Sequence, residues 1–527
     1  MSASRIKTWM IVTFFCLSLL LIPGINHGLW RPDEPREAGI CAEMARTRDF
    51  VVPHLNGIPF LEKPPLYYAM AAVSGSLLGV DKDIPYRLIS LLFAALTLFI
   101  TYSAASLQNG SIVGLIAAGI LASSGDFFKL SRWIQVDNAL VFGVALAMYA
   151  YLKIMKSFRI RDSALLGVAI GISFMAKGFV GPAIIASAVI ADTLCRRDIT
   201  LLWKTRPHII LACAGIIILP WIVVLWDRGG WAFVREIIVV NNIMRFTGAP
   251  EGAALGHQNG FFFYFTRFPL GFLPWTLLFI PALIAALKEY RHNPYVSWLV
   301  GPIILLTISS TKRGVYLVPL FSAAACMTAW WLSKAQHMKW EETLLKATWG
   351  IAVLACFIPF AGIFLGLPVY GAILGTLAVS FLAYVIMFGI NELKALSLVL
   401  IMSIALGAGS CIYFDYMKPH QDYLAFARQA LTISAQEEIT ILEPDEIMEG
   451  VLPMVSGKRY PMAREARDIR SDGMYVWVDK NDKVLRSLQH QAEVKILFER
   501  KMGVGGRKTA RLAYVLSSTP QIKGIRF

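Results

Sequence analysis

Repeated apolar runs constrain the fold of this chain more than any other feature. Runs of roughly 18 to 22 residues are long enough to cross a bilayer as helices. We predict about 13 such spans, at residues 9–27, 85–107, 111–128, 138–156, 163–176, 178–195, 208–226, 267–287, 294–309, 314–333, 345–366, 368–390 and 394–414. The apolar stretch 66–79 is too short to cross, which predicts an interfacial or re-entrant helix.

The charge of the chain fits a membrane protein better than a nucleic-acid-binding one. Only 16% of residues are charged, against about 25% in a soluble chain. The net charge of +15 could suggest nucleic acid, but basic cytoplasmic loops explain it in a polytopic protein. We therefore expect the lipid bilayer as a partner, and no nucleic acid. The first run lacks a small-residue cleavage site, so we expect it to be retained.

The basic loops also predict an orientation. Lys and Arg accumulate on the cytoplasmic side of membrane proteins, so we place four basic clusters and the N-terminus in the cytoplasm. The clusters are Lys153, Lys156, Arg159 and Arg161; Arg196, Arg197, Lys204 and Arg206; Lys288 and Arg291; and Lys334 and Lys339. The opposite side then receives the C-terminal tail and four loops, at 28–84, 129–137, 227–266 and 310–313.

The composition changes near residue 415. Residues 415–527 mix polar and apolar positions, with alternating runs at 439–442 and 474–478 and helical patterns at 421–434 and 482–491. The run Gly503-Val504-Gly505-Gly506 separates two strand-like segments and indicates a hairpin turn. The predicted fold class is an α-helical polytopic membrane protein with a small C-terminal soluble α/β domain, divided into residues 1–414 and 415–527.

A charged island follows the first span. Asp33 can be the N-cap of a helix with Pro35 in its first turn, and residues 34–46 would then form an amphipathic helix on the membrane. Asp33 can also be the carboxylate that accepts a proton from an incoming nucleophile or orients it. The two interpretations are compatible, since a capping carboxylate is also well positioned.

A second charged segment reads Glu62-Lys63-Pro64-Pro65. Lys63 can be an interfacial anchor, or an ammonium group that the prolines hold rigidly against a phosphate. Glu62 would then orient that lysine or an acceptor group. In the 129–137 loop, Asp137 can cap the following span or take part in chemistry.

Two further segments carry cations on the side where the charge bias disfavours them. Lys312 and Arg313 are adjacent there, and Tyr316 follows one helical turn later, a pattern that favours anion binding. The 227–266 loop carries four more candidates, which can equally be ordinary polar loop residues: Asn241, Asn242, Arg245 and His257.

In combination, these motifs resemble the integral-membrane glycosyltransferases of the GT-C class. The motifs are an early Asp-Glu loop, Glu-Lys-Pro-Pro, Ser-Arg-x-x-x-x-Asp and a late Lys-Arg-x-x-Tyr-Leu-x-Pro. They are similar to the dolichyl-phosphate-mannose–protein mannosyltransferase superfamily, whose bacterial branch includes the lipid A aminoarabinose transferases. The resemblance covers most of the chain, and four motifs in order on one side of the membrane are more specific than any one of them.

The resemblance implies inverting transfer of a sugar from a polyprenyl-phosphate (undecaprenyl-phosphate) donor to an envelope acceptor such as lipid A, at the periplasmic face of a bacterial inner membrane. It implies that Asp33 is catalytic, with Glu62 and Asp137 near the acceptor or a metal. Arg36, Lys63 and Tyr316 would surround the donor phosphate. No cofactor is certain, and a divalent metal held by Glu62, Asp137 or His257 stays open.

The residues lead to a lipid-linked donor by a second route. Nucleotide sugars are not normally available on the outer side, so a donor there must arrive in the bilayer. We expect a cationic clamp for its phosphate, formed by Arg36, Lys63, Lys312, Arg313 and Tyr316 with Arg245 and His257. The aromatic run 261–265 would help to hold its tail.

Three alternatives remain open from the sequence. One is a mannosyltransferase-like enzyme with a protein acceptor, because Asp33-Glu34 continues with Pro35-Arg36 where aminoarabinose transferases have Ala-Arg-Tyr. Another is a flippase or transporter of lipid-linked sugars, which would place ionisable groups near the bilayer midplane. The third is a sensor or assembly protein that acts through its C-terminal domain.

Overall fold

The computed structural model describes residues 24–30, 33–250, 259–334, 337–355, 357, 394–435, 437–442, 445–463, 468–469, 472–490, 492–502 and 508–516. Within these ranges the chain forms two compact units. The first contains the described residues of Leu61–Leu66 and Ser90–Ile412, and the second contains those of Gly24–Phe60, Tyr67–Ile89 and Tyr413–Phe527. The first loop therefore groups with the C-terminal domain.

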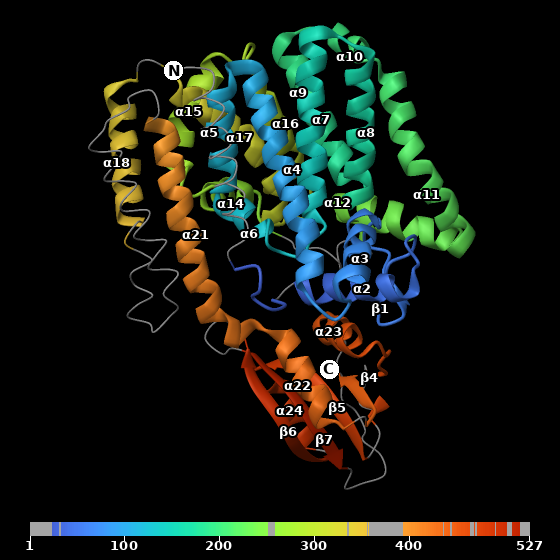
Figure 1. Ribbon diagram of the computed structural model, residues 1–527. Helices are drawn as coiled ribbons and strands as arrows, with labels where there is room; N and C mark the ends of the chain where they lie inside the picture. The colour runs from blue at the N-terminus through green and yellow to red at the C-terminus, as the bar shows by residue number, and fades with distance from the viewer. Residues whose placement is uncertain are drawn as a thin grey trace. The chain divides into compact units, whose positions relative to one another are not determined.

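The first unit is helical throughout its described residues (Figure 1). Its elements are α4 (Ile84–Asn109), which begins in the second unit, α5 (Ser111–Ala122), α6 (Gly125–Leu130), α7 (Asp137–Ser157), α8 (Ile160–Lys177), α9 (Val180–Arg196), α10 (Thr200–Lys204), α11 (Pro207–Arg235), η1 (Glu236–Met244), α12 (Arg245–Thr247), α14 (Phe263–Gly271), α15 (Thr276–Lys288), α16 (Pro294–Ile308), η2 (Gly314–Leu317), α17 (Val318–Leu332), α18 (Lys339–Ala355) and α21 (Lys394–Gln421), which ends in the second unit. Helix α8 packs against both α7 and α11, and α9 packs against α16.

Several apolar helices make this a multi-pass membrane protein. Five described helical stretches are long and apolar enough to cross a bilayer by themselves, and a sixth span results if the bent pair α14 and α15 is counted as one. The predicted spans at 85–107, 138–156, 208–226, 314–333 and 394–414 correspond to these five. The predicted spans at 9–27 and 368–390 fall mostly or wholly outside the described residues.

Two predicted segments have a different form. The run 267–287 was expected to be one span; it consists of α14 and α15, which are bent by 119° relative to each other, and Pro274 lies between them. A proline lacks the N–H that a continuous helix needs. The 227–266 segment was expected to be a loop, but it is helical as far as Thr247. Its middle section, η1, is a π-helix.

A buried carboxylate ties three helices of the first unit together. Asp192 on α9 accepts hydrogen bonds from Tyr151 of α7 (2.8 Å), Ser297 of α16 (3.0 Å) and Arg196 (2.8 Å). A buried charge is tolerated when it is paired and hydrogen-bonded in this way. The network therefore joins α7, α9 and α16 in the interior of the first unit.

The second unit contains the predicted α/β domain. Its elements are α2 (Glu34–Thr47), β1 (His54–Leu55), β2 (Ile58–Pro59), α3 (Leu66–Leu78), α22 (Tyr423–Ile433), β3 (Ile439–Leu442), α23 (Glu446–Ser456), β4 (Met462–Ala463), β5 (Gly473–Lys480), α24 (Lys483–Gln489), β6 (Glu493–Met502) and β7 (Lys508–Leu516). The five-stranded sheet has the order β4-β3-β5-β7-β6. Strands β3, β4 and β5 are parallel, whereas β7 is antiparallel to β5 and β6. The strands predicted on both sides of the hairpin turn are β6 and β7, and residues 503–507 lie outside the described ranges.

Helix α2 departs from its predicted environment. It was expected to lie on the membrane with one apolar face, but all its residues from Glu34 to Ala45 are buried in protein. Its charged first turn is held by Arg87, which is completely buried. Arg87 donates to the Glu34 carboxylate (3.1 Å), to the Ile25 carbonyl (2.7 Å), and to Asp83 and the Gly28 carbonyl. This network sets the direction in which the chain enters α2.

Candidate functional site

The first group of candidate residues lies at the start of α2, inside the second unit. Asp33 occupies the N-cap position of the helix, with Pro35 in the first turn as predicted, but its side chain makes no capping hydrogen bond. Its carboxylate accepts a hydrogen bond from Arg36 instead (3.1 Å), and the same guanidinium nitrogen donates to Glu37 (3.1 Å). The other terminal nitrogen of Arg36 donates to Glu446 of α23 (2.6 Å). Asp33 is thus a buried carboxylate whose orientation depends on Arg36.

Tyr68 on α3 adds a hydroxyl group near Glu37. Burial raises the pKa of Tyr68 well above its usual range, and the Glu37 carboxylate raises it further. The phenol therefore stays protonated at any physiological pH and is available as a hydrogen-bond donor. Arg36 also lies over the ring of Phe60, 5.4 Å from its centroid, a distance typical of a cation–π contact.

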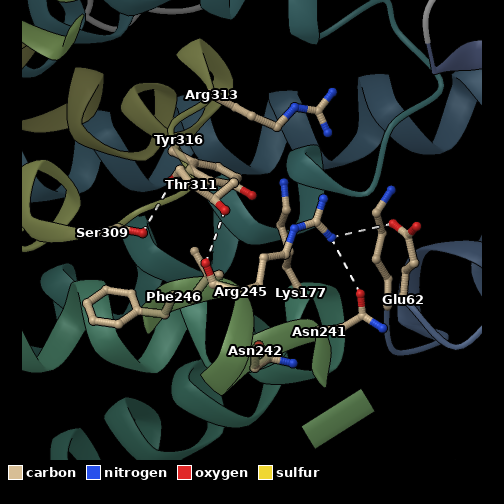
Figure 2. Close-up of a pocket in the computed structure, with 12 residues that line it drawn as sticks. Glu62, Lys177, Asn241, Asn242, Arg245, Phe246, Ser309, Thr311, Arg313 and Tyr316 are labelled. Carbon is tan, nitrogen blue, oxygen red and sulfur yellow. Dashed lines mark hydrogen bonds and ion pairs between the residues drawn. The ribbon is translucent and has the colours of Figure 1, made fainter. Parts of the chain in front are cut away.

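The second group lines a cavity inside the first unit, shown in Figure 2. Its twelve lining residues are Glu62, Lys63, Lys177, Val180, Asn241, Asn242, Arg245, Phe246, Ser309, Thr311, Arg313 and Tyr316. Four of them are cations and one is an acid, so the cavity is suited to an anion. In Figure 2 the charged ends of Lys177, Arg245 and Arg313 border the same opening.

The cavity joins three of the predicted motifs. Glu62 forms an ion pair with Arg245 (3.6 Å), and Lys63, which is only 6% exposed, lines the same wall. Tyr316 contributes from η2 and Arg313 from the segment before it. The structure therefore brings together seven of the candidates named from the sequence, which are Glu62, Lys63, Asn241, Asn242, Arg245, Arg313 and Tyr316.

Lys177 is the residue that sequence reasoning left out of the site. It ends α8, donates to Asp137 Oδ1 (2.5 Å), and lies over the ring of Tyr316 at 4.5 Å from the centroid. Asp137 is the first residue of α7 and follows the N-cap Val136, so Asp137 is not the N-cap that the sequence allowed. The sequence signal that could have found Lys177 is a lysine at the end of an apolar helix. Cations in such positions are rare unless they have a function.

Two adjacent asparagines of the π-helix η1 connect the walls of the cavity. Asn241 donates to the Leu61 carbonyl (3.2 Å), next to Glu62. Asn242 accepts from the Phe179 N–H (2.8 Å), just beyond Lys177. Gly178 lies between them with φ +63°, and a Cβ there would come within 2.4 Å of the Asn242 side chain. The sequence alone named both asparagines as candidates but did not distinguish them from ordinary loop residues.

The remaining predicted residues lie apart from this cavity or outside the described ranges. The Lys312 ammonium donates to the Ser309 carbonyl (2.6 Å), and Lys312 is not a lining residue. His257 lies outside the described residues. Within the described ranges, no three or more His, Cys, Asp or Glu side chains gather as metal ligands. A metal bound with the help of His257 stays a prediction.

Comparison with known proteins supports the resemblance drawn from the motifs. Residues 62–226 match the model of the dolichyl-phosphate-mannose-protein mannosyltransferase family. Over 377 residues the chain is 28% identical to the undecaprenyl phosphate-alpha-4-amino-4-deoxy-L-arabinose arabinosyl transferase of Pectobacterium atrosepticum, a match that covers 70% of this chain and 66% of the relative. The Serratia proteamaculans enzyme of the same name is 29% identical over 61% of this chain and 58% of its own length. The matches thus span less than two thirds of the length of these relatives.

A solved structure extends the likeness to nearly the whole chain. The crystal structure of ArnT from Cupriavidus metallidurans bound to undecaprenyl phosphate superposes with a TM-score of 0.76 at 17% identity, covering 97% of this chain and 98% of that one. The apo form of the same protein gives a TM-score of 0.77. The predicted resemblance to GT-C glycosyltransferases is confirmed, and the chain has the ArnT-like fold.

Proposed function

We propose that the protein is an inverting glycosyltransferase that moves a sugar from undecaprenyl phosphate to lipid A. The observation that carries the proposal is the cavity with four cations, Lys63, Lys177, Arg245 and Arg313, in a chain with the ArnT-like fold. The relatives named for transfer from an undecaprenyl-phosphate sugar support the donor class. We propose no nucleic acid as a partner.

The chemistry follows from charge. The acceptor oxygen attacks the anomeric carbon, the bond from that carbon to the phosphate oxygen breaks, and undecaprenyl phosphate leaves with the bonding electrons. Lys63, Lys177, Arg245 and Arg313 stabilise the charge that develops on the leaving phosphate, which is the main electrostatic contribution in such a reaction. Tyr316 donates a hydrogen bond to the same phosphate. Asp33 accepts the proton of a hydroxyl acceptor, or orients an acceptor that is already ionised.

Mass spectrometry tests the proposal. Lipid A from cells that carry the gene is expected to contain a species heavier by one sugar, and a deletion strain is expected to lack it. The purified protein should form the same product from the undecaprenyl-phosphate sugar and lipid A. If a protein carries the added sugar in place of lipid A, the assignment of lipid A as the acceptor is wrong. If the protein moves the lipid-linked sugar across vesicle membranes and forms no transfer product, the proposal that it is an enzyme is wrong.

We also propose the topology that the basic loops predict. About 13 spans, a cytoplasmic N-terminus and a periplasmic domain over residues 415–527 would place the enzyme in the inner membrane. The segments 28–84, 129–137, 227–266 and 310–313 would then face the periplasm. The basic ends of α7 and α9 would face the cytoplasm.

Thiol labelling checks this orientation. Single cysteines are introduced at Gln489, the exposed last residue of α24, and at Ser157, the exposed last residue of α7, in a background without the seven native cysteines. An impermeant reagent applied to intact spheroplasts should label position 489 and spare 157. In opened vesicles both should react, which controls for access. Labelling of 157 alone, or of both in spheroplasts, would reject the orientation and with it the need for a lipid-linked donor.

A further inference from the structure

The C-terminal domain makes backbone contact with the helix that follows Asp33. Helices α2 and α23 meet at two glycines, Gly39 and Gly450. A Cβ on Gly39 would lie 2.4 Å from the Gly450 Cα, and a Cβ on Gly450 would lie 2.2 Å from the Pro35 carbonyl oxygen. Only glycines permit this approach, and it brings the first turn of α23 beside the first turn of α2.

This contact places a carboxylate of the C-terminal domain on Arg36. Glu446 is the first residue of α23, one turn before Gly450, and its carboxylate accepts from a terminal nitrogen of Arg36 at 2.6 Å. The N-cap Asp445 fixes this turn by accepting the Ile447 N–H. The Glu446 side chain is half exposed, whereas that of Arg36 is 8% exposed. The pair therefore restrains a buried guanidinium from its open side.

The two ends of the guanidinium have different partners. One terminal nitrogen is bound to Glu446, and the other is shared by Asp33 and Glu37, each at 3.1 Å. An arginine side chain has four rotatable bonds and loses that freedom only when several partners fix its planar group. Loss of Glu446 removes the 2.6 Å hydrogen bond at one end of the guanidinium. The planar group is then held less firmly and can turn its other end away from Asp33.

We propose that Glu446 is a positioning residue for the transfer reaction, acting through Arg36 to hold the Asp33 carboxylate in one orientation. The C-terminal domain then completes the catalytic group at the start of α2 in addition to any role of its own. The proposal rests on the proposed function, because Asp33 has to act in sugar transfer for its orientation to matter.

Kinetics of Glu446 variants test the proposal in the full-length protein. Glu446→Ala should lower kcat by about 10- to 100-fold, the loss expected when a reacting group is displaced by a fraction of an ångström to an ångström. The donor KM should change less than about twofold, since a positioning residue does not bind the donor. Glu446→Asp, which keeps the charge, should recover part of the rate, and Glu446→Gln should recover less.

A matched variant separates positioning from docking of the domain. Arg459 and Glu43 form another ion pair between the C-terminal domain and α2, at 3.3 Å, with Arg459 largely exposed. Arg459→Ala removes that pair at a distance from Asp33 and should leave kcat within about twofold, as expected of an exposed pair. Equal losses in Glu446→Ala and Arg459→Ala would overturn the proposal, and so would a raised donor KM with an unchanged kcat.

Cryo-EM of Glu446→Ala gives a readout that is independent of activity. The guanidinium of Arg36 should leave Asp33 in the variant and stay on it in the wild type. If Arg36 remains on Asp33 in the variant, the proposal is wrong. If Arg36 moves but the wild type transfers no sugar, the positioning contact stands and the proposed function is what fails.

Discussion

Asp33→Asn is expected to lower the rate of sugar transfer by about 10²–10⁴-fold, the usual contribution of a general base. The amide oxygen of the new side chain can still accept the Arg36 hydrogen bond, so expression and membrane insertion should be normal. The rate is measured with purified protein at saturating donor and acceptor. Asp81→Asn, which changes an exposed carboxylate of the same unit, is the control and should be near wild type.

The size of this loss identifies the acceptor group. A hydroxyl acceptor needs a base, so the full loss is expected for it. A phosphate acceptor has a second pKa of about 6 and is mostly ionised at neutral pH, so a smaller loss would point to an orienting role for Asp33. Turnover of the Asp33→Asn variant equal to that of Asp81→Asn would remove Asp33 from the mechanism.

Loss of the Lys63 ammonium should weaken use of the donor. A hydrogen bond to a charged group is worth about 1.5–3 kcal/mol, so Lys63→Ala is expected to raise the apparent donor KM by about 10- to 150-fold. Tyr316→Phe removes a neutral donor and should have a smaller effect in the same direction, about 2- to 10-fold. Both are measured by titrating the donor at saturating acceptor.

The control for these variants is another lysine of the first unit. Lys129 is exposed, lies over the Trp133 ring and does not line the cavity, so Lys129→Ala should leave both KM values near wild type. If Lys63→Ala raises the acceptor KM while the donor KM stays constant, the cationic cavity binds the acceptor and the assignment of the donor phosphate is wrong.

The features that could be predicted from the sequence are those that depend on local patterns. Apolar runs gave the positions of α4, α7, α11, α17 and α21, and alternation gave strands such as β3 and β5. Charged residues in an otherwise apolar chain pointed to Glu62, Lys63, Arg313 and Tyr316, which the structure brings to one cavity. In these cases the signal is strong because an unused charge is costly beside a bilayer.

The features that could not be predicted depend on residues far apart in the chain. Lys177 bonds to Asp137, which lies 40 residues away in the sequence. The periodicity of apolar residues does not predict such a pair. The bend between α14 and α15 is hidden because both halves are apolar. The π-helix η1 differs from an α-helix only in its hydrogen-bond register. The sequence therefore gave no sign that Asn241 bonds to Leu61 whereas Asn242 bonds to Phe179.

The contact between Arg36 and Glu446 also has a consequence for biosynthesis. These partners are separated by 410 residues, and a ribosome adds about 5–20 residues per second. The first turn of α2 therefore waits roughly 20 to 80 s for its partner, while nearly all the membrane helices are made. If Glu446 positions Arg36 as proposed, a nascent or truncated chain should lack the proposed transfer activity until the C-terminal domain has been translated and folded.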